Sequence, residues 1–252
     1  MIRITPLDEQ VYITKADFYP GEKWLVNGAI LKGRDYYVVW DTASYPKDMA
    51  ELSSLLNEKS AFAIYSHADW DHCWGTCGYP FDHVLAHTNA IDRFNNELSS
   101  TLKRFRNDHP NEWRGVKLVP PDITFDKKLT IEMGDFSLEL YHFKGHTTDS
   151  IIGFIPEKGY LLGGDSVETI PVINDPEDVP AWIDNLEKWM KRKDITQVLP
   201  GHGELTDSSI LLDNYDYLQE LKNKHPFKIS DNSKFYRQVH IDNCKKMGVT
   251  FG

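Results

Sequence analysis

The chain has 252 residues, of which 40% are hydrophobic and 26% are charged, so we expect a well-filled core and exclude wholesale disorder. Its 28 Lys and Arg residues stand against 38 Asp and Glu residues, which gives a formal net charge of −10. A general nucleic-acid binder needs a basic surface that displaces counterions from phosphates, so this charge argues against nucleic acid as a partner.

Hydropathy and cysteine content indicate where the protein resides. The sequence contains no run of about 18 consecutive apolar residues, the length that a membrane span requires, so no membrane partner is expected. The first residues carry Asp8 and Glu9 and no apolar stretch typical of a secretion signal. Three cysteines, Cys73, Cys77 and Cys244, are too few and too unevenly spaced for a disulfide scaffold. We therefore expect a soluble, cytoplasmic protein.

Short apolar runs rich in β-branched and aromatic residues predict four strands in the first third of the chain. They cover residues 11–14, 25–31, 36–41 and 61–66, with a hairpin turn at 33–35. Apolar residues at helical spacing predict a helix over 46–56, with Pro46 at its first position.

A longer helix is predicted over residues 90–107, because its apolar residues share one helical face: Phe94, Leu98, Leu102 and Phe105. Further strands are predicted at 129–133, 136–143, 150–155, 160–163 and 197–199, and further helices at 180–192 and 208–224. From His225 onward the sequence is polar and weakly periodic. We predict a single domain over residues 1–252, with 225–252 as a C-terminal extension.

The order of these elements favours an α+β fold. Groups of strands are separated by single helices, so strand and helix do not alternate throughout. Mixed sheets covered by outer helices fit this order better than a doubly wound parallel sheet does.

Histidine and aspartate follow the ends of four predicted strands, beside glycine or other small residues. The first strand end carries His67, Asp69, Asp71 and His72, and the other three carry His146, Asp165 and His202. Imidazole and carboxylate are ligands suited to zinc, iron or manganese. Adjacent glycines let the backbone turn sharply enough to aim such side chains inward. We therefore predict a metal site where these four loops converge.

This pattern resembles the metallo-β-lactamase superfamily. The family signature is His-x-His-x-Asp-His after a strand, followed by a distal His, a bridging Asp and a last His, and the resemblance covers roughly residues 11–221. It implies a four-layer αβ/βα sandwich, two mixed β-sheets flanked by helices, with a dinuclear site at its edge. The implied cofactors are two divalent metal ions, zinc in the first place and iron or manganese as alternatives.

The resemblance also implies a role for each candidate residue. Site one would take His67, Asp69 and His146, site two would take Asp71, His72 and His202, and Asp165 would bridge the two metals. A bridging water would be the nucleophile, and Asp71 would orient it as the catalytic residue.

The chain departs from the family pattern at Asp69, where most members have histidine. Two divalent cations and three carboxylates leave a charge of about +1, where the usual two carboxylates would leave about +2. An oxygen-rich site should be less Lewis acidic and should favour harder metals. The di-iron branch of the superfamily carries Glu at this position and reacts with O₂ or NO. Alternatively, Asp69 points away and leaves site one poorly occupied.

Two functions follow from these features. The first is a metal-dependent hydrolase of a small ester, thioester, lactone or phosphoester. The alternative is a non-hydrolytic di-iron protein that binds or reduces O₂ or NO, and a third possibility is a metal-binding scaffold without efficient catalysis. The expected partner is a small-molecule substrate, and the aromatic content of 12% would permit a homodimer.

Several residues could shape a substrate site. The predicted helix over 90–107 lies between ligand segments, where this superfamily often places its substrate cover, and its basic residues either meet an anion or form a solvated face: Lys103, Arg104 and Arg106. Trp70 and Trp74 either wall a pocket or pack in the core. Acidic residues such as Glu168, placed near the mouth, would disfavour nucleic acid.

Overall fold

The computed structural model describes residues 2–19, 24–225, 229 and 233–249, whose strands form two mixed sheets. The seven-stranded sheet runs in sequence order through β1 (Arg3–Pro6), β2 (Val11–Asp17), β3 (Leu25–Lys32), β4 (Tyr36–Trp40), β5 (Ser60–Ile64), β6 (His83–His87) and β7 (Ile123–Phe125). Strands β1 to β4 pair antiparallel, and β4 to β7 pair in parallel.

The five-stranded sheet has the order β12-β11-β10-β9-β8. Its strands are β8 (Lys128–Glu132), β9 (Ser137–His142), β10 (Ile151–Ile155), β11 (Tyr160–Gly164) and β12 (Gln197–Pro200). Only the β11–β12 pair is parallel. Each strand predicted from the sequence has its counterpart here, whereas β1, β6 and β7 were not predicted.

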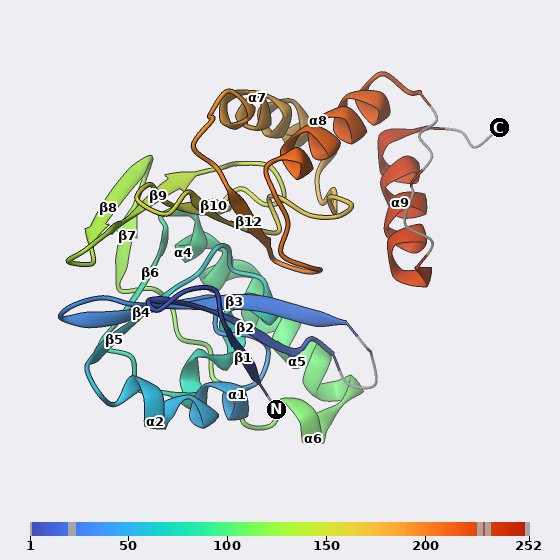
Figure 1. The fold of residues 1–252 in the computed structure, drawn as a ribbon. Coiled ribbons are helices and arrows are strands. Elements are labelled where there is room, and N and C mark those ends of the chain that lie inside the picture. The colour runs from blue at the N-terminus through green and yellow to red at the C-terminus, as the bar shows by residue number, and fades with distance from the viewer. Residues whose placement is uncertain (1, 20–23, 226–228, 230–232, 250–252) are drawn as a thin grey trace.

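The helices lie outside the two sheets (Figure 1). On the five-stranded sheet they are η3 (Pro176–Asp178), α7 (Val179–Met190) and α8 (Ser209–Lys222), and α9 (Lys234–Met247) packs beside α8. On the seven-stranded sheet they are α1 (Pro46–Glu51), α2 (Ser53–Leu56), α3 (Trp70–Cys73), η1 (Trp74–Gly78), α4 (Asn89–Arg93), η2 (Phe94–Leu98), α5 (Ser99–Asp108) and α6 (Pro110–Trp113). Among the helices described, none has the length and apolarity needed to cross a membrane.

Apolar side chains from both sheets meet in one buried cluster between them. Leu31 and Trp40 come from the first sheet, and Leu138 and Ile155 from the second. A second cluster joins the five-stranded sheet to α7 and α8, and two others join the seven-stranded sheet to its helices. The chain therefore has the predicted α+β fold, with helices and sheets in four layers.

Two predicted helices differ in detail from the observed ones. The helix predicted over 46–56 is divided at Leu52 into α1 and α2. The helix predicted over 90–107 is continuous from α4 to α5 but contains a π-helical turn, η2. Its expected apolar face is confirmed, since Phe94, Leu98 and Leu102 are buried.

The C-terminal part contains a helix that the sequence did not predict. Helix α9 places Tyr236, Cys244 and Met247 in the cluster beneath α8. Residues 226–228, 230–232 and 250–252 of the predicted extension lie outside the described residues. The division into one domain and an extension stays a prediction.

Parallel strand pairing positions the candidate site. Trp40 pairs with Ile64 across β4 and β5, and Gly164 pairs with Pro200 across β11 and β12. Parallel neighbours end at the same edge of a sheet. The segments after these four strands, together with the loop after β9, therefore converge.

Candidate metal centre

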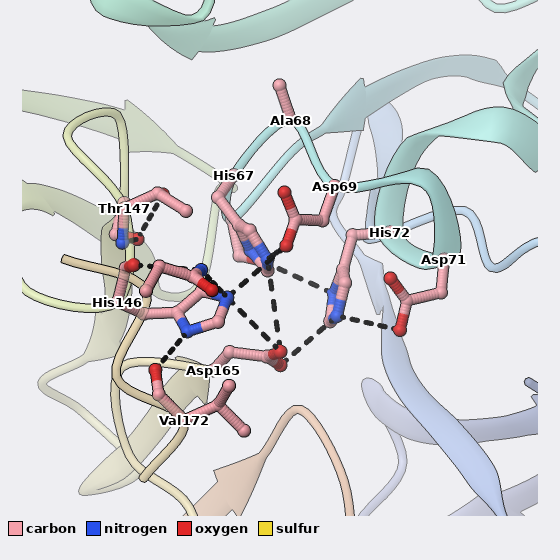
Figure 2. A network of polar contacts seen from close by, with 12 residues as sticks. His67, Ala68, Asp69, Asp71, His72, His146, Thr147, Asp165 and Val172 are labelled. Carbon is pink, nitrogen blue, oxygen red and sulfur yellow. Dashed lines mark hydrogen bonds and ion pairs between the residues drawn. The ribbon is translucent and has the colours of Figure 1, made fainter. Parts of the chain in front are cut away.

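All seven predicted site residues lie together at this edge, and six of them appear in Figure 2 with their side chains turned toward one another. His67 and Asp69 follow β5, and Asp71 and His72 belong to the short helix α3. The other three follow β9, β11 and β12: His146, Asp165 and His202.

The first three-residue group contains His67, Asp69 and His146. Asp69 Oδ2 lies 3.4 Å from Nε2 of His67 and 3.3 Å from Nε2 of His146. The Asp69 carboxylate therefore points into the group, and the alternative in which it points away is wrong for this structure.

The second group contains Asp71, His72 and His202. Asp71 Oδ2 lies 3.2 Å from Nε2 of His202 and 3.6 Å from Nε2 of His72. In both groups the candidate ligand atoms lie within 4.8 Å of one another, as one cation would require.

Asp165 lies between the groups and turns one oxygen to each. Its Oδ1 is 3.1 Å from Nε2 of His72 and 3.7 Å from Nε2 of His202. Its Oδ2 is 3.9 Å from Nε2 of His67 and 3.7 Å from Nε2 of His146. A carboxylate in this place can contact a cation in either group.

Gly164 makes room for this arrangement. Its φ of 49° is one that residues with a Cβ rarely adopt, and a Cβ there would lie 2.7 Å from the Ser66 side chain. The glycine lets β11 end close to the His67 segment, so that Asp165 enters between the two groups.

Buried polar atoms without hydrogen bonds indicate that the centre is built for metal. Within the described part of the chain, Nε2 of His67, Nε2 of His72 and Oδ1 of Asp165 are buried and make no hydrogen bond, although the last two atoms lie 3.1 Å apart. Burying a polar atom without a hydrogen bond costs free energy unless a bound group interacts with that atom. A cation ligated by these atoms would do so, and the nitrogen and oxygen donors suit zinc, iron or manganese.

Contacts behind the histidines fix their orientation. Nδ1 of His72 lies 2.9 Å from Asp41 Oδ2, Nδ1 of His146 lies 2.9 Å from the Val172 carbonyl, and Nδ1 of His202 lies 3.0 Å from the Leu25 carbonyl. An acceptor at Nδ1 holds the proton there, so Nε2 is left free to ligate a metal. All three histidines therefore present Nε2 to the centre.

Carboxylates and basic side chains at the centre shift one another's pKa values. Burial disfavours the Asp69 carboxylate, yet nearby His67, His146 and Arg93 hold the pKa of Asp69 well below its usual range. Burial also lowers the pKa of histidine, but at His202 nearby carboxylates, chiefly Asp165, outweigh it and raise the pKa to about 10. The centre therefore favours positive charge, which suits a cation site.

Glu168 corrects one expectation. It is 2% exposed, and its Oε1 accepts a hydrogen bond of 2.7 Å from the His202 backbone N–H. Burial and the nearby Asp165 raise the pKa of Glu168 well above its usual range. Placing Glu168 at the mouth of the site was wrong, because the side chain turns inward and supports the His202 loop.

Asp41 and Arg93 are functional candidates that the sequence analysis missed. Asp41 supports His72, and Arg93 Nη2 lies 2.5 Å from Asp69 Oδ1. The signal for Asp41 was an acidic residue at the end of the predicted strand 36–41, which precedes the His67 strand in the chain. No local signal separates Arg93 from the other basic residues of its helix.

The residues that could shape a substrate site differ in their surroundings, and their contact with substrate stays a prediction. Arg106 donates hydrogen bonds to the carbonyls of Trp113 and Val116, while Lys103 and Arg104 are exposed. Trp74 is fully buried, and Trp70 lies in an aromatic cluster with Phe18, Tyr19 and Phe105. Trp74 is therefore a core residue, whereas Trp70 is partly accessible.

Comparison with known proteins shows which proteins this chain resembles. The model of the metallo-beta-lactamase superfamily matches residues 22–202. The metallo-beta-lactamase type 2 of Bacillus cereus is 26% identical over 229 residues, which cover 86% of this chain and 83% of that protein. The human acyl-coenzyme A thioesterase MBLAC2 is 27% identical over 207 residues, or 71% of each chain.

Solved structures show the same fold. A metallo-beta-lactamase from Pontibacter korlensis has a TM-score of 0.65 at 22% identity, and the superposition covers 87% of this chain and 99% of that one. The sec-alkylsulfatase Pisa1 from a Pseudomonas species has a TM-score of 0.69 at 16% identity, and the superposition covers 89% of this chain and 42% of that one.

Proposed function

The chain is a hydrolase that belongs to the metallo-beta-lactamase superfamily, and we propose that it cleaves a small ester or thioester at a dinuclear metal site. The observation that carries this proposal is the pair of three-residue groups with Asp165 between them, together with the buried ligand atoms that make no hydrogen bond. We propose zinc as the metal in both groups.

Each residue has a role in this proposal. His67, Asp69 and His146 hold the first ion, Asp71, His72 and His202 hold the second, and Asp165 contacts both. Divalent cations bound there would supply Lewis acidity, which lowers the pKa of water and polarises a carbonyl. Asp71 orients the attacking water and accepts its proton, while the rigid β-strand ends hold the remaining side chains in place.

The acyl substrate class is favoured by the relatives. One is named for lactams and another for acyl-coenzyme A thioesters, and both bonds are cleaved at a carbonyl carbon. We therefore propose a carbonyl-centred substrate, with esters, thioesters and lactones ahead of phosphoesters.

Asp69 supports the alternative di-iron protein. Its Oδ2 faces both histidines of the first group, so one candidate site has an oxygen ligand where a third imidazole is usual. Oxygen ligands favour harder metals, which here include iron.

The deciding experiment measures metal content and the absorption spectrum of protein produced in metal-balanced medium, followed by a substrate panel. Two zinc ions per chain and hydrolysis of esters or thioesters are expected. Two iron ions and a near-ultraviolet band that bleaches on reduction would favour the di-iron protein. Turnover of phosphodiesters alone would overturn the acyl substrate class.

Two variants distinguish a metal site from a general loss of folding. His146→Ala should lose metal and activity while its circular dichroism spectrum stays native. His225→Ala is the matched control, because His225 is exposed and contacts Glu220 away from the centre. Equal losses in both variants would contradict the proposed site.

A further inference from the structure

Arg93 joins the candidate metal centre to the helical segment above it. This residue ends α4, and its side chain is only 15% exposed. Its guanidinium reaches three carboxylates: Nη2 is 2.5 Å from Asp69 Oδ1, Nη1 is 3.1 Å from Asp149 Oδ1, and Nε is 3.0 Å from Glu97 Oε2. Few side chains other than arginine can reach three acceptors in this planar arrangement.

The two oxygens of Asp69 face different partners. Oδ1 accepts from Arg93, and Oδ2 faces Nε2 of His67 and of His146. The hydrogen bond to Arg93 thereby fixes the carboxylate plane and leaves a single oxygen directed at the centre. A charged hydrogen bond of this kind is about twice as strong as a neutral one.

Asp149 holds Arg93 from the other side. It is fully buried, and its Oδ2 accepts a hydrogen bond of 2.8 Å from the Ala68 backbone N–H, next to Asp69 in sequence. The chain Asp69–Arg93–Asp149 thus returns to the same loop that carries the candidate ligand. Arg93 cannot shift toward one carboxylate without losing the other.

We propose that Arg93 is a positioning residue that makes Asp69 a one-oxygen ligand of the first metal and so allows a carboxylate to replace imidazole there. This inference rests on the metal site proposed above. It predicts that the contribution of Arg93 to metal binding depends on which side chain occupies position 69.

A double-mutant cycle tests this dependence. Zinc affinity is measured against a chromophoric chelator for the wild type, Arg93→Met, Asp69→His and the double variant. With Asp69 in place, Arg93→Met should weaken the first zinc site by about tenfold or more. In the Asp69→His background, the same change should alter zinc affinity less than about threefold, because an imidazole has no second oxygen for Arg93 to hold.

The thermal midpoint of each metal-free variant separates positioning from folding. Loss of Arg93 leaves the buried Asp149 without its cation in both backgrounds, so both metal-free midpoints should fall, and they should fall further where Asp69 also loses its contact with Arg93. This fall is measured without metal and therefore reports the cost to folding apart from zinc affinity. Glu97→Gln is the matched control, since it removes the negative charge of the third partner of Arg93 without touching Asp69, and its zinc affinity should equal that of the wild type.

The outcomes separate the two proposals. If the wild type binds no zinc or iron, the proposed metal site is wrong. If the wild type binds two ions and Arg93→Met lowers zinc affinity by the same factor in both backgrounds, the metal site stands and the role of Arg93 is overturned. Arg93→Lys keeps the charge but not the planar guanidinium, and its zinc affinity should lie between those of the wild type and Arg93→Met.

Discussion

Asp41 and His72 are hydrogen-bonded inside the protein, with Asp41 Oδ2 2.9 Å from His72 Nδ1 and both side chains buried. The second oxygen of Asp41 accepts a hydrogen bond of 2.7 Å from the Ser66 backbone N–H. The Asp41 carboxylate therefore orients one candidate ligand, His72, and fixes the loop that carries another, His67. Asp41 takes a positive φ of 55° to do so, which is an uncommon conformation for a residue with a side chain.

Asp41→Asn should weaken metal binding, because an amide has only one oxygen and Asp41 supplies two acceptors. If the amide nitrogen faces His72, the imidazole proton moves to Nε2, where it blocks ligation. Loss of such a supporting carboxylate typically costs about 10- to 100-fold in metal affinity. Zinc titration against a chelator measures the effect.

Asp122→Asn is a close control for that variant. Asp122 Oδ2 is 2.9 Å from His83 Nδ1, and its Oδ1 accepts from the Val84 backbone N–H, so the local geometry resembles that of Asp41. His83 lies outside the centre, and zinc affinity should not change. Equal effects of the two variants would contradict the role assigned to Asp41.

Gly201→Ala should displace Asp165, and its Cβ would also lie 2.9 Å from the Gly164 backbone carbon, so some loss of stability is expected. A Cβ at Gly201 would lie 2.0 Å from Asp165 Oδ1, so the carboxylate between the two groups must move. A displacement of about 1 Å at a reacting centre can reduce activity by about 100-fold. Metal content, activity and urea unfolding should be measured together. Gly115→Ala is the control, because nothing lies within 4 Å of its Cβ position, and it should match the wild type.

Most of the fold could be predicted because its central strands are short apolar runs buried along their length and its longer helices have an apolar face. Strand β1 was missed because all four of its residues are exposed, so no apolar alternation marks it. Strand β6 was missed because a histidine stands at each end of a short apolar run. Helix α9 is mostly polar, and its few buried residues contact the body of the protein only after folding.

The candidate ligands could be predicted because they are concentrated in short segments after strands. Their supporting residues were not predicted, since both reach the centre through tertiary contacts: Asp41 was marked only as an acidic residue at a strand end, and Arg93 had no local signal. Parallel pairing of β4 with β5 places Asp41 beside Ser66, and α4 places Arg93 above Asp69. Such relationships depend on the packing of whole elements.

Stability should depend on pH through Asp8. Its Oδ2 lies 2.9 Å from Lys158 Nζ, which joins a turn of one sheet to a turn of the other, and Oδ1 accepts from the backbone N–H of Gln10 and Val11. Burial alone would raise the pKa of Asp8, but these partners lower it below the ordinary value. A lowered carboxyl pKa adds stability above the unfolded-state pKa of about 3.9 and loses it as the pH falls through the folded value.

Asp8→Asn should therefore destabilise the protein by about 1 kcal/mol at pH 7, and the difference from the wild type should shrink below about pH 4. Urea unfolding at both pH values measures it. Asp135→Asn is the control, because the Arg34–Asp135 pair also joins turns of the two sheets but is largely exposed, and exposed pairs contribute little. A difference for Asp8→Asn that persists unchanged well below pH 4 would contradict the assignment to the charged form.

Metal removal should lower the stability of the fold, because the centre joins segments that follow β5, β9, β11 and β12. A ligand that binds only the folded state stabilises it by about 2.7 kcal/mol when its free concentration is about 100 times the dissociation constant. The thermal midpoint should therefore fall when a chelator is added and return with excess zinc. In Asp165→Asn this zinc-dependent shift should be smaller, since the side chain between the two groups loses its charge. If neither chelator nor zinc changes the thermal midpoint of the wild type, no metal is bound to the native state, whatever the activity of the preparation.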